Sequence, residues 1–260
     1  MLGNGVIRGT AYDLRAETFD YFWPDRSWEI AGWARLARRY GKHIVEWMCN
    51  TGELACGLAR RNFEAIGVDL VPEMLLVAER RASALPPERR PHWIQDDIRD
   101  AALARRDKDV AIIAGNAFGQ LLTRSDQLDA LSTVWRHLRP GGALALTARR
   151  ALRESVPTKT GIYGPSRPTP TELSLRKVVR QQYDAETQLL TMHERVEIRR
   201  EDHKRHFEYA YSVRLFHPDE IVRLLTQAGF VGIGMFGDYD LKPWRQGARE
   251  WIICAEHPLA

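Results

Sequence analysis

Short apolar runs alternate with helix-like segments between residues 43 and 148, and this alternation constrains the fold more than any other feature. The runs are HIVEWM from residue 43, AIGVDL from 65, HWIQDD from 92, DVAIIAG from 109 and ALALTA from 143. Helical segments stand between them, the clearest being SDQLDALSTVWRHL from residue 125. Short apolar strands separated by helices are typical of a parallel sheet with both faces covered. We therefore predict a doubly wound α/β core.

The pattern changes after residue 150. Residues 155–172 are rich in Pro, Gly, Ser and Thr, which predicts a loop. Three strand-like runs follow, LSLRKVVRQQY, QLLTMHERVEIRR and HFEYAYSVRLF, and they predict an antiparallel meander. A helix is expected from His217 or Pro218 to Gly229, and two strands close the chain. We expect an N-terminal aromatic and helical lid at 1–40, a core at 41–150 and 215–260, and an inserted antiparallel substrate cap at 151–214.

Composition narrows the class of protein. The formal net charge is +4, from 38 basic and 34 acidic residues in a mixed pattern, so a nucleic-acid partner is disfavoured. Three cysteines form no CxxC pair and no regular metal spacing, and their odd count argues against a disulfide framework. No run has the length of a membrane span or the apolar core of a signal peptide. We expect a cytoplasmic protein that does not associate with membranes, and a homo-oligomer is compatible with the sequence.

The turn in IVEWMCNTG carries the first functional signal. In a doubly wound sheet the turn after the first strand approaches a ligand, and an acid at the end of the second strand accepts hydrogen bonds from ribose hydroxyls. Asp69 stands at that second position, near the spacing of roughly 20 residues that dinucleotide sites show. Glu46, inside the first strand, would repel a pyrophosphate but attract an ammonium or a sulfonium. The sequence thus favours a cationic ligand over a dinucleotide.

The stretch IVEWMCNTGELACGLARRNFEAIGVDLVPEML resembles the first two motifs of class I S-adenosylmethionine-dependent methyltransferases, with QDDIRD, GNAFGQLL and HLRPGGALAL as later motifs in the same order. The match covers roughly residues 40–150, and AGF at Ala228 continues it. The inserted strands resemble the cap of the glycine and aminosugar N-methyltransferase branch. The resemblance implies a Rossmann-like seven-stranded sheet with that cap. It also implies S-adenosylmethionine as cofactor, with S-adenosylhomocysteine as its product.

The resemblance also implies a set of cofactor-binding residues. Glu46 corresponds to the acid of the first strand, Asp69 binds ribose, and Asp97 with Ile98 meets the adenine. The full implied set is Tyr21, Glu46, Met48, Asn50, Gly52, Asp69, Leu70, Met74, Asp97, Ile98 and Asn116. Met48 and Asn50 occupy positions where the family carries glycine. Either they reshape the methionine end of the pocket or they close it.

Substrate contacts are less defined. The aromatic lead-in around Tyr21 to Trp23 either closes over the cofactor, whose sulfonium an aromatic face attracts, or clamps the first helix. Polar side chains of the inserted strands either line a substrate cavity or meet water. The candidate substrate residues are Tyr12, Trp23, Phe118, His193 and Tyr211. No residue is assigned as a catalytic base.

We expect an enzyme that moves a methyl group from S-adenosylmethionine to a nitrogen or oxygen of a small molecule, in specialised metabolism. The alternative, motivated by Met48 and Asn50, is a non-catalytic or repurposed protein of the same fold, either regulatory or retaining the cofactor without methyl transfer. RNA methylation is a weaker third hypothesis.

Overall fold

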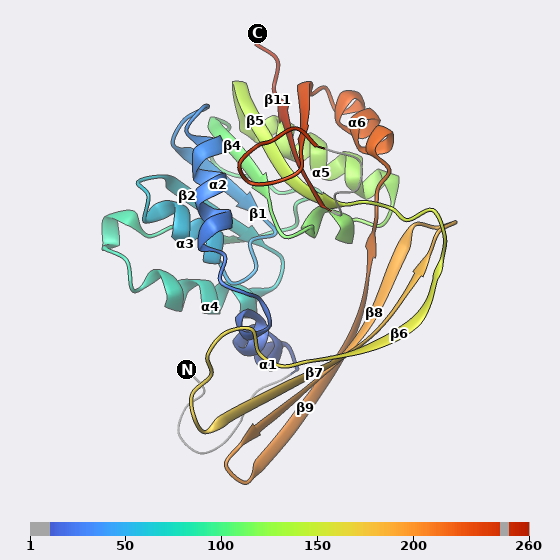
Figure 1. Cartoon of the computed structure of the whole chain (residues 1–260). Helices are drawn as coiled ribbons and strands as arrows, with labels where there is room; N and C mark the ends of the chain where they lie inside the picture. The colour runs from blue at the N-terminus through green and yellow to red at the C-terminus, as the bar shows by residue number, and fades with distance from the viewer. Residues whose placement is uncertain (1–10, 245–249, 260) are drawn as a thin grey trace. The chain divides into compact units, whose positions relative to one another are not determined.

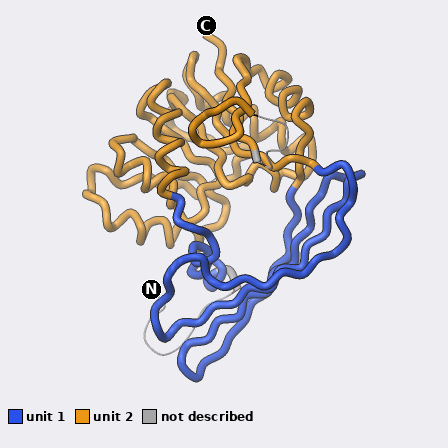
Figure 2. Tube along the Cα trace, viewed as in Figure 1, with its two compact units in different colours: residues 1–26, 152–213 blue, residues 27–151, 214–260 orange. Residues whose placement is uncertain are grey.

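The computed structural model describes residues 11–244 and 250–259, and the chain divides into two compact units (Figure 2). Unit 1 joins the residues up to Arg26 with Leu152–Val213, and unit 2 joins Ser27–Ala151 with the residues from Arg214 onward. The first boundary falls inside the segment 1–40 that we expected to act as a lid. Residues 27–40 therefore belong to the same unit as the large sheet.

Unit 2 is built on a seven-stranded sheet (Figure 1). Its strands are β1 His43–Trp47, β2 Glu64–Asp69, β3 His92–Gln95, β4 Lys108–Ile113, β5 Leu138–Arg149, β10 Val231–Phe236 and β11 Glu250–Glu256. Their order is β10-β11-β5-β4-β1-β2-β3. Strands β1 to β5 are parallel, while β11 runs antiparallel to both β5 and β10. The predicted Rossmann-like fold class is confirmed.

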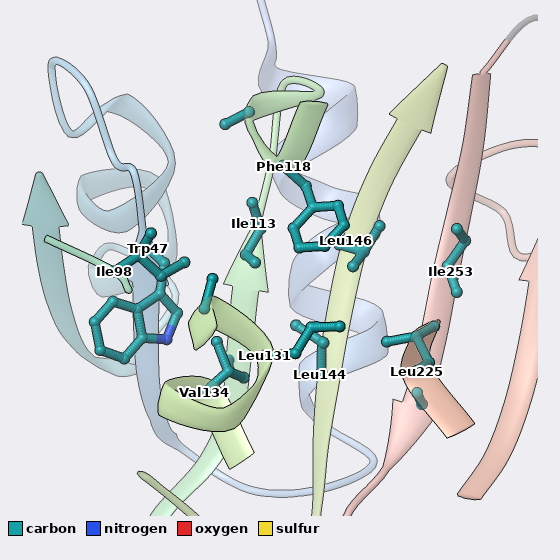
Figure 3. Packing of buried hydrophobic residues seen from close by; sticks show 14 of the residues in the cluster. Trp47, Ile98, Ile113, Phe118, Leu131, Val134, Leu144, Leu146, Leu225 and Ile253 are labelled. Atoms are coloured by element: carbon teal, nitrogen blue, oxygen red, sulfur yellow. The ribbon is translucent and has the colours of Figure 1, made fainter. Parts of the chain in front are cut away.

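Helices cover both faces of this sheet. The helices are α2 Ser27–Ala37, α3 Glu53–Ala59, α4 Pro72–Ala82, α5 Arg124–His137 and α6 Pro218–Gln227, with short 3-10 turns η2 Pro87–Arg89 and η3 Ala117–Gln120. Apolar side chains of α5 and α6 pack on the face that includes Val45 and Trp47, as Figure 3 shows for α5. Those of α2 and α3 pack on the face that includes Ile44. Successive side chains of β1 point to opposite faces of the sheet, so this strand contributes to the hydrophobic core on each face.

One buried carboxylate ties together the amino ends of three neighbouring strands. Asp109, at the start of β4, accepts hydrogen bonds from the backbone NH groups of Lys42 and His43 at 2.8 and 2.9 Å. It also accepts one from Nε of Arg139, at the start of β5, at 2.6 Å. Arg139 donates in turn to the carbonyl of Tyr40. The starts of β1, β4 and β5 are therefore held in register by a single side chain.

Unit 1 is an antiparallel sheet with one short helix. Its strands are β6 Val156–Tyr163, β7 Leu173–Asp184, β8 Leu189–Arg200 and β9 His203–Arg214, in the order β6-β7-β8-β9. Helix α1 Ala11–Thr18 and the 3-10 turn η1 Phe19–Phe22 precede it. Leu14 of α1 packs against Leu175, Val196 and Phe207 of the sheet. The predicted antiparallel strands are confirmed.

The prediction of a loop at 155–172 is wrong in its first half, because β6 occupies Val156–Tyr163. Proline cannot donate a backbone hydrogen bond, so it is tolerated in a sheet only at edges and bulges. Strand β6 is an edge strand, and its register shifts between Val156 and Lys159, around Pro157. β-branched and aromatic residues then dominate the rest of the strand. Proline content misled the prediction because it does not distinguish an edge strand from a loop.

Candidate functional site

The turn after β1 holds three residues in the left-handed backbone region at alternate positions. Met48 has φ of 56°, Asn50 has 50° and Gly52 has 65°. These are the positions where the family motif carries glycine. For an ordinary L-residue this conformation costs about 1–2 kcal/mol, and asparagine tolerates it better than most. Two of the three positions hold residues other than glycine, yet all three have the left-handed backbone conformation that glycine adopts without strain.

Asp69 holds this turn in place. Its Oδ2 accepts a hydrogen bond from the backbone NH of Asn50 at 2.7 Å, and its Oδ1 accepts one from that of Val71 at 2.9 Å. The side-chain amide of Asn50 donates to the carbonyl of Met48 at 3.0 Å. Asp69 is 8% exposed. A charge-assisted hydrogen bond, accepted by a buried carboxylate at the end of β2, thus stabilises the strained turn after β1.

Glu46 of β1 places its carboxylate at the start of α3. It is buried, and its Oε2 accepts a hydrogen bond from the backbone NH of Ala55 at 2.8 Å. A negative charge is stabilised there because the first NH groups of a helix have no partner within the helix. The charge of Glu46 therefore helps to fix α3 against the turn, in addition to any attraction for a cationic ligand.

Trp93 of β3 packs against two glycines of the site. Gly67 lies directly opposite Trp93 in the β2–β3 pairing. A Cβ atom at Gly67, or one at Gly52, would lie 2.4 Å from an atom of the Trp93 ring. The indole therefore needs a bare backbone at both positions. Sequence analysis missed Trp93, and the signal that points to it is the strand register that sets a tryptophan beside a glycine.

Asp97 is engaged in an ion-pair network beyond β3. Its carboxylate pairs with the Arg99 guanidinium at 2.6 Å and accepts from the Arg99 backbone NH, while Arg99 also pairs with Asp126 of α5 at 2.9 Å. The hydrogen bonds from the Arg99 side chain lower the pKa of Asp97. Ile98, the next residue, is buried in the core. An adenine bound at Asp97 would share this carboxylate with Arg99.

Two residues after β4 adopt the left-handed conformation as well, Gly115 with φ of 63° and Asn116 with 60°. The Asn116 backbone NH donates to Oγ1 of Thr147 at 2.8 Å. Phe118 is fully buried and contacts Phe216, with ring centroids 5.6 Å apart. Its side chain therefore belongs to the core, and core packing accounts for an aromatic residue at this position.

Residues that follow Asp69 complete the predicted set in unit 2. Leu70 is 58% exposed, whereas Met74 of α4 is buried. The carboxyl ends of β1 and β2 meet at one sheet edge, and the structure brings together there the turn from Met48 to Gly52 with Asp69. Met74 instead packs inside the domain.

The remaining predicted residues lie in unit 1. Tyr21 packs beside the cluster around Leu14, and burial raises its pKa, as do Glu17 and Asp20. Trp23 is 43% exposed and His193 lies exposed on β8. Tyr211 donates from its hydroxyl to Glu194 at 3.0 Å. The side chain of Tyr12 lies outside the described part of the structure. No group of three or more His, Cys, Asp or Glu suited to a metal ion occurs within residues 11–244 and 250–259.

Comparison with known proteins shows what part of the larger unit is similar to. Residues 44–142 match the family model of the methyltransferase domain. This part of the core is therefore similar to a methyltransferase domain. Among curated proteins, this domain is 32% identical over 101 residues to the putative methyltransferase YqeM of Bacillus subtilis. Over 122 residues it is 33% identical to the ubiquinone/menaquinone biosynthesis C-methyltransferase UbiE of Dinoroseobacter shibae. These matches cover 39% and 46% of this chain, and the chain spans 40% and 47% of the two relatives.

Solved structures share the fold over nearly the whole chain. The sugar N-methyltransferase KedS8 of Streptoalloteichus superposes with a TM-score of 0.73 at 19% identity, covering 99% of this chain and 98% of that one. The amino pentose methyltransferase CalS10 of Micromonospora echinaspora, solved with bound S-adenosylmethionine, gives 0.68 at 20% identity, covering 97% and 99%. The resemblance to class I methyltransferases is confirmed. Among the residues that the structure describes, no helix has the length and apolar character needed to cross a membrane.

Proposed function

We propose that this chain binds S-adenosylmethionine at the carboxyl ends of β1 and β2 and transfers its methyl group to a nitrogen or oxygen of a small molecule. The observation that carries the proposal is the turn at Met48, Asn50 and Gly52. It keeps the backbone shape of a glycine motif at a cost in strain, and Asp69 holds it. Strain that the surrounding structure maintains is typical of functional sites.

The residues present at this edge fit such a cofactor. A Cβ added at Gly115 would have no atom within 4 Å, so the backbone there borders open space. Leu70 offers an exposed apolar surface directly after Asp69. Two buried carboxylates, Glu46 and Asp69, favour a ligand with positive charge. Open backbone, an apolar surface and negative charge together suit a nucleoside that carries a sulfonium.

Each residue has a defined part in this proposal. Asp69 accepts from ribose hydroxyls while it holds the turn, and Asp97 with Ile98 meets the adenine. Asn116 and the turn residues Met48 and Asn50 border the methionine end. The cofactor supplies an electrophilic methyl group. The protein then contributes mainly by alignment, and positioning alone gives effective molarities of about 10⁵ M or more.

The acceptor is proposed from the neighbours. KedS8 and CalS10 are described as acting on sugars, and both span nearly the same chain length. We propose an amine or hydroxyl of a small molecule of specialised metabolism as acceptor, with the antiparallel sheet of unit 1 selecting it. The match to UbiE favours a second candidate, transfer to carbon. Mass spectrometry of the product formed with a methyl-labelled cofactor separates the two, since the label leaves with a different fragment in each.

Titration calorimetry with S-adenosylmethionine and S-adenosylhomocysteine tests the first step. We expect saturable binding of both, and absence of heat at millimolar ligand would rule out the proposed site. Asp69→Ala should weaken binding at least about tenfold, because it removes a charged hydrogen-bond acceptor and the tether of the turn. Asp129→Ala removes an exposed carboxylate from α5 and serves as the control. Equal affinity of the Asp69 variant and the wild type would contradict the assignment of Asp69.

A further inference from the structure

A buried carboxylate interrupts the apolar face of the unit 1 sheet. Along β8 the alternate residues Leu190, Met192, Val196 and Ile198 are buried, and the position between Met192 and Val196 on this face is Glu194, which is 5% exposed. The alternating pattern of buried and exposed residues along the strand predicts an apolar residue at this position. Departures from such a pattern concentrate at functional positions.

Side chains from two neighbouring strands satisfy Glu194. The Tyr209 hydroxyl donates to its Oε2, and the Tyr211 hydroxyl donates to its Oε1 at 3.0 Å. Lys177 of β7 places Nζ 3.4 Å from Oε2. The Arg15 guanidinium of α1 lies 4.5 Å from the centre of the Tyr209 ring. All five side chains belong to unit 1.

Stability alone is a poor explanation for this network. Burying an ion pair such as Glu194 with Lys177 requires the loss of hydration from both charges, and apolar side chains of similar volume often give equal or greater stability. The neighbouring buried side chains on β7 and β8 are apolar, including Val179, which lies opposite Glu194. The network therefore has a cost that an apolar residue at this position would avoid.

The network fixes the orientation of two hydroxyl protons. Burial, with Glu194 beside it, raises the pKa of the Tyr209 phenol, so this phenol keeps its proton at neutral pH. A carboxylate only accepts hydrogen bonds, so each tyrosine must direct its proton toward Glu194. The phenol oxygens then interact with any further group as acceptors.

We propose that Glu194 is a positioning residue for the methyl acceptor, orienting Tyr209 and Tyr211 to accept hydrogen bonds from hydroxyl or neutral amine groups of that molecule. The inference rests on the proposed function and deepens it. Lys177 balances the charge of Glu194, so the network offers acceptor atoms without an excess of negative charge. A neutral polyhydroxylated or amino-hydroxylated molecule fits this chemistry better than an anion or a quaternary ammonium ion.

Fluorine NMR of the full chain labelled with 3-fluorotyrosine tests the proposal with defined probes. The eight tyrosines give a tractable spectrum, and Tyr209→Phe and Tyr211→Phe assign two of the signals. D-glucose and D-glucosamine supply donor groups, tetramethylammonium is a cation without donors, and inorganic phosphate is an anion. We expect the two sugars to shift the Tyr209 and Tyr211 signals saturably. The absence of such shifts, or equal shifts by phosphate or tetramethylammonium, would overturn the proposal.

Glu194→Gln tests the positioning role. The carboxamide NH2 group must donate, so one tyrosine has to turn its proton away. Apparent affinity for the sugars should fall about threefold to tenfold, as expected for one lost hydrogen bond between neutral groups. Glu197→Gln, on the same strand but in a more exposed ion pair with Arg176, is the matched control and should bind as the wild type does. Wild-type affinity in Glu194→Gln would overturn the positioning role.

Calorimetry of cofactor binding separates this inference from the proposed function. The proposed cofactor site lies in unit 2, so the Glu194→Gln variant should bind S-adenosylmethionine with unchanged affinity. If the wild type does not bind the cofactor, the proposed function is wrong. If it binds the cofactor but shows no response to the sugars, only the inference about Glu194 is wrong. If Glu194→Gln does not fold, Tyr209→Phe removes a single hydroxyl and carries the same prediction for sugar affinity.

Discussion

Met48 and Asn50 give the turn after β1 the backbone conformation of a glycine motif without the glycines. Both adopt the left-handed conformation that glycine adopts without strain, and Asp69 fixes the turn through the Asn50 backbone NH. Asparagine tolerates the left-handed region better than most residues do, whereas methionine rarely adopts it. Of the two replacements, Met48 therefore carries most of the conformational strain.

Comparing two substitutions at Met48 measures that strain. Met48→Gly and Met48→Ala both remove its partly buried side chain, but only alanine keeps a Cβ at φ of 56°. We expect Met48→Gly to be the more stable of the two by about 1 kcal/mol, the reverse of the usual order in helices and strands. Urea denaturation gives the free energies of unfolding. Greater stability of the alanine variant would mean that the turn relaxes and the strain is absent.

At the residue scale, sequence analysis located this turn and Asp69 because the distance between them along the chain reflects one strand–helix–strand unit. It assigned Phe118 to the substrate, whereas the aromatic ring lies in the core against Phe216. It also did not name Glu194, which is buried among apolar residues of β8. The hydrogen-bond partners of a buried polar residue come from the neighbouring strands. The sequence of one strand does not show which residues those partners are.

Apolar periodicity predicted the strands and helices of the core, but it did not predict the register in which neighbouring strands pair. Strand β3 illustrates the difference. Its position was predicted, but the register that sets Trp93 against Gly67 becomes visible only in the sheet. The edge strand β6 was missed for a related reason, since its proline is tolerated only because one side of the strand has no partner strand.

A substitution at Gly67 tests the contact between β2 and β3. Gly67→Ala would place a Cβ 2.4 Å from the Trp93 ring and 2.9 Å from Sγ of Cys49, which should destabilise unit 2 by about 1–3 kcal/mol. Gly164→Ala, with no atom within 4 Å of its Cβ, should be nearly neutral. Thermal or urea unfolding measures both.

The double variant identifies the neighbour responsible. If the indole is the obstacle, combining Gly67→Ala with Trp93→Leu should be less destabilising than the sum of the single changes, by about 1 kcal/mol or more. Strict additivity in this double-mutant cycle would show that another atom resists the new methyl group.

At the scale of the whole molecule, Asp109 links the amino ends of three parallel strands at a distance in sequence that no local pattern reveals. Burial tends to raise the pKa of its carboxyl, but hydrogen bonds from the His43 and Lys42 backbone and from Arg139 outweigh this effect, and the pKa is lowered. A carboxyl whose pKa is lower in the folded state stabilises the protein above its unfolded pKa of about 3.9. That stability disappears as the pH falls through the folded value.

Asp109→Asn should therefore lower stability most at neutral pH, by about 2–4 kcal/mol, and make the loss of stability in acid less steep. Denaturation midpoints from neutral pH down to about pH 3 give the comparison, with Asp129→Asn as an exposed control. A variant that loses stability in acid as steeply as the wild type would show that other carboxyls carry the acid sensitivity.

The burial of all three cysteines has a practical consequence. Cys49, Cys56 and Cys254 are 3%, 0% and 7% exposed, and burial raises the pKa of each thiol, that of Cys56 to about 11. Maleimide dyes react with exposed thiolates, so the three native cysteines should react with these dyes only slowly. Cysteines introduced at the exposed positions Lys159 in unit 1 and Asp129 in unit 2 would take a donor and an acceptor fluorophore selectively. Energy transfer between the dyes would then report, molecule by molecule, whether cofactor and acceptor draw the two units together.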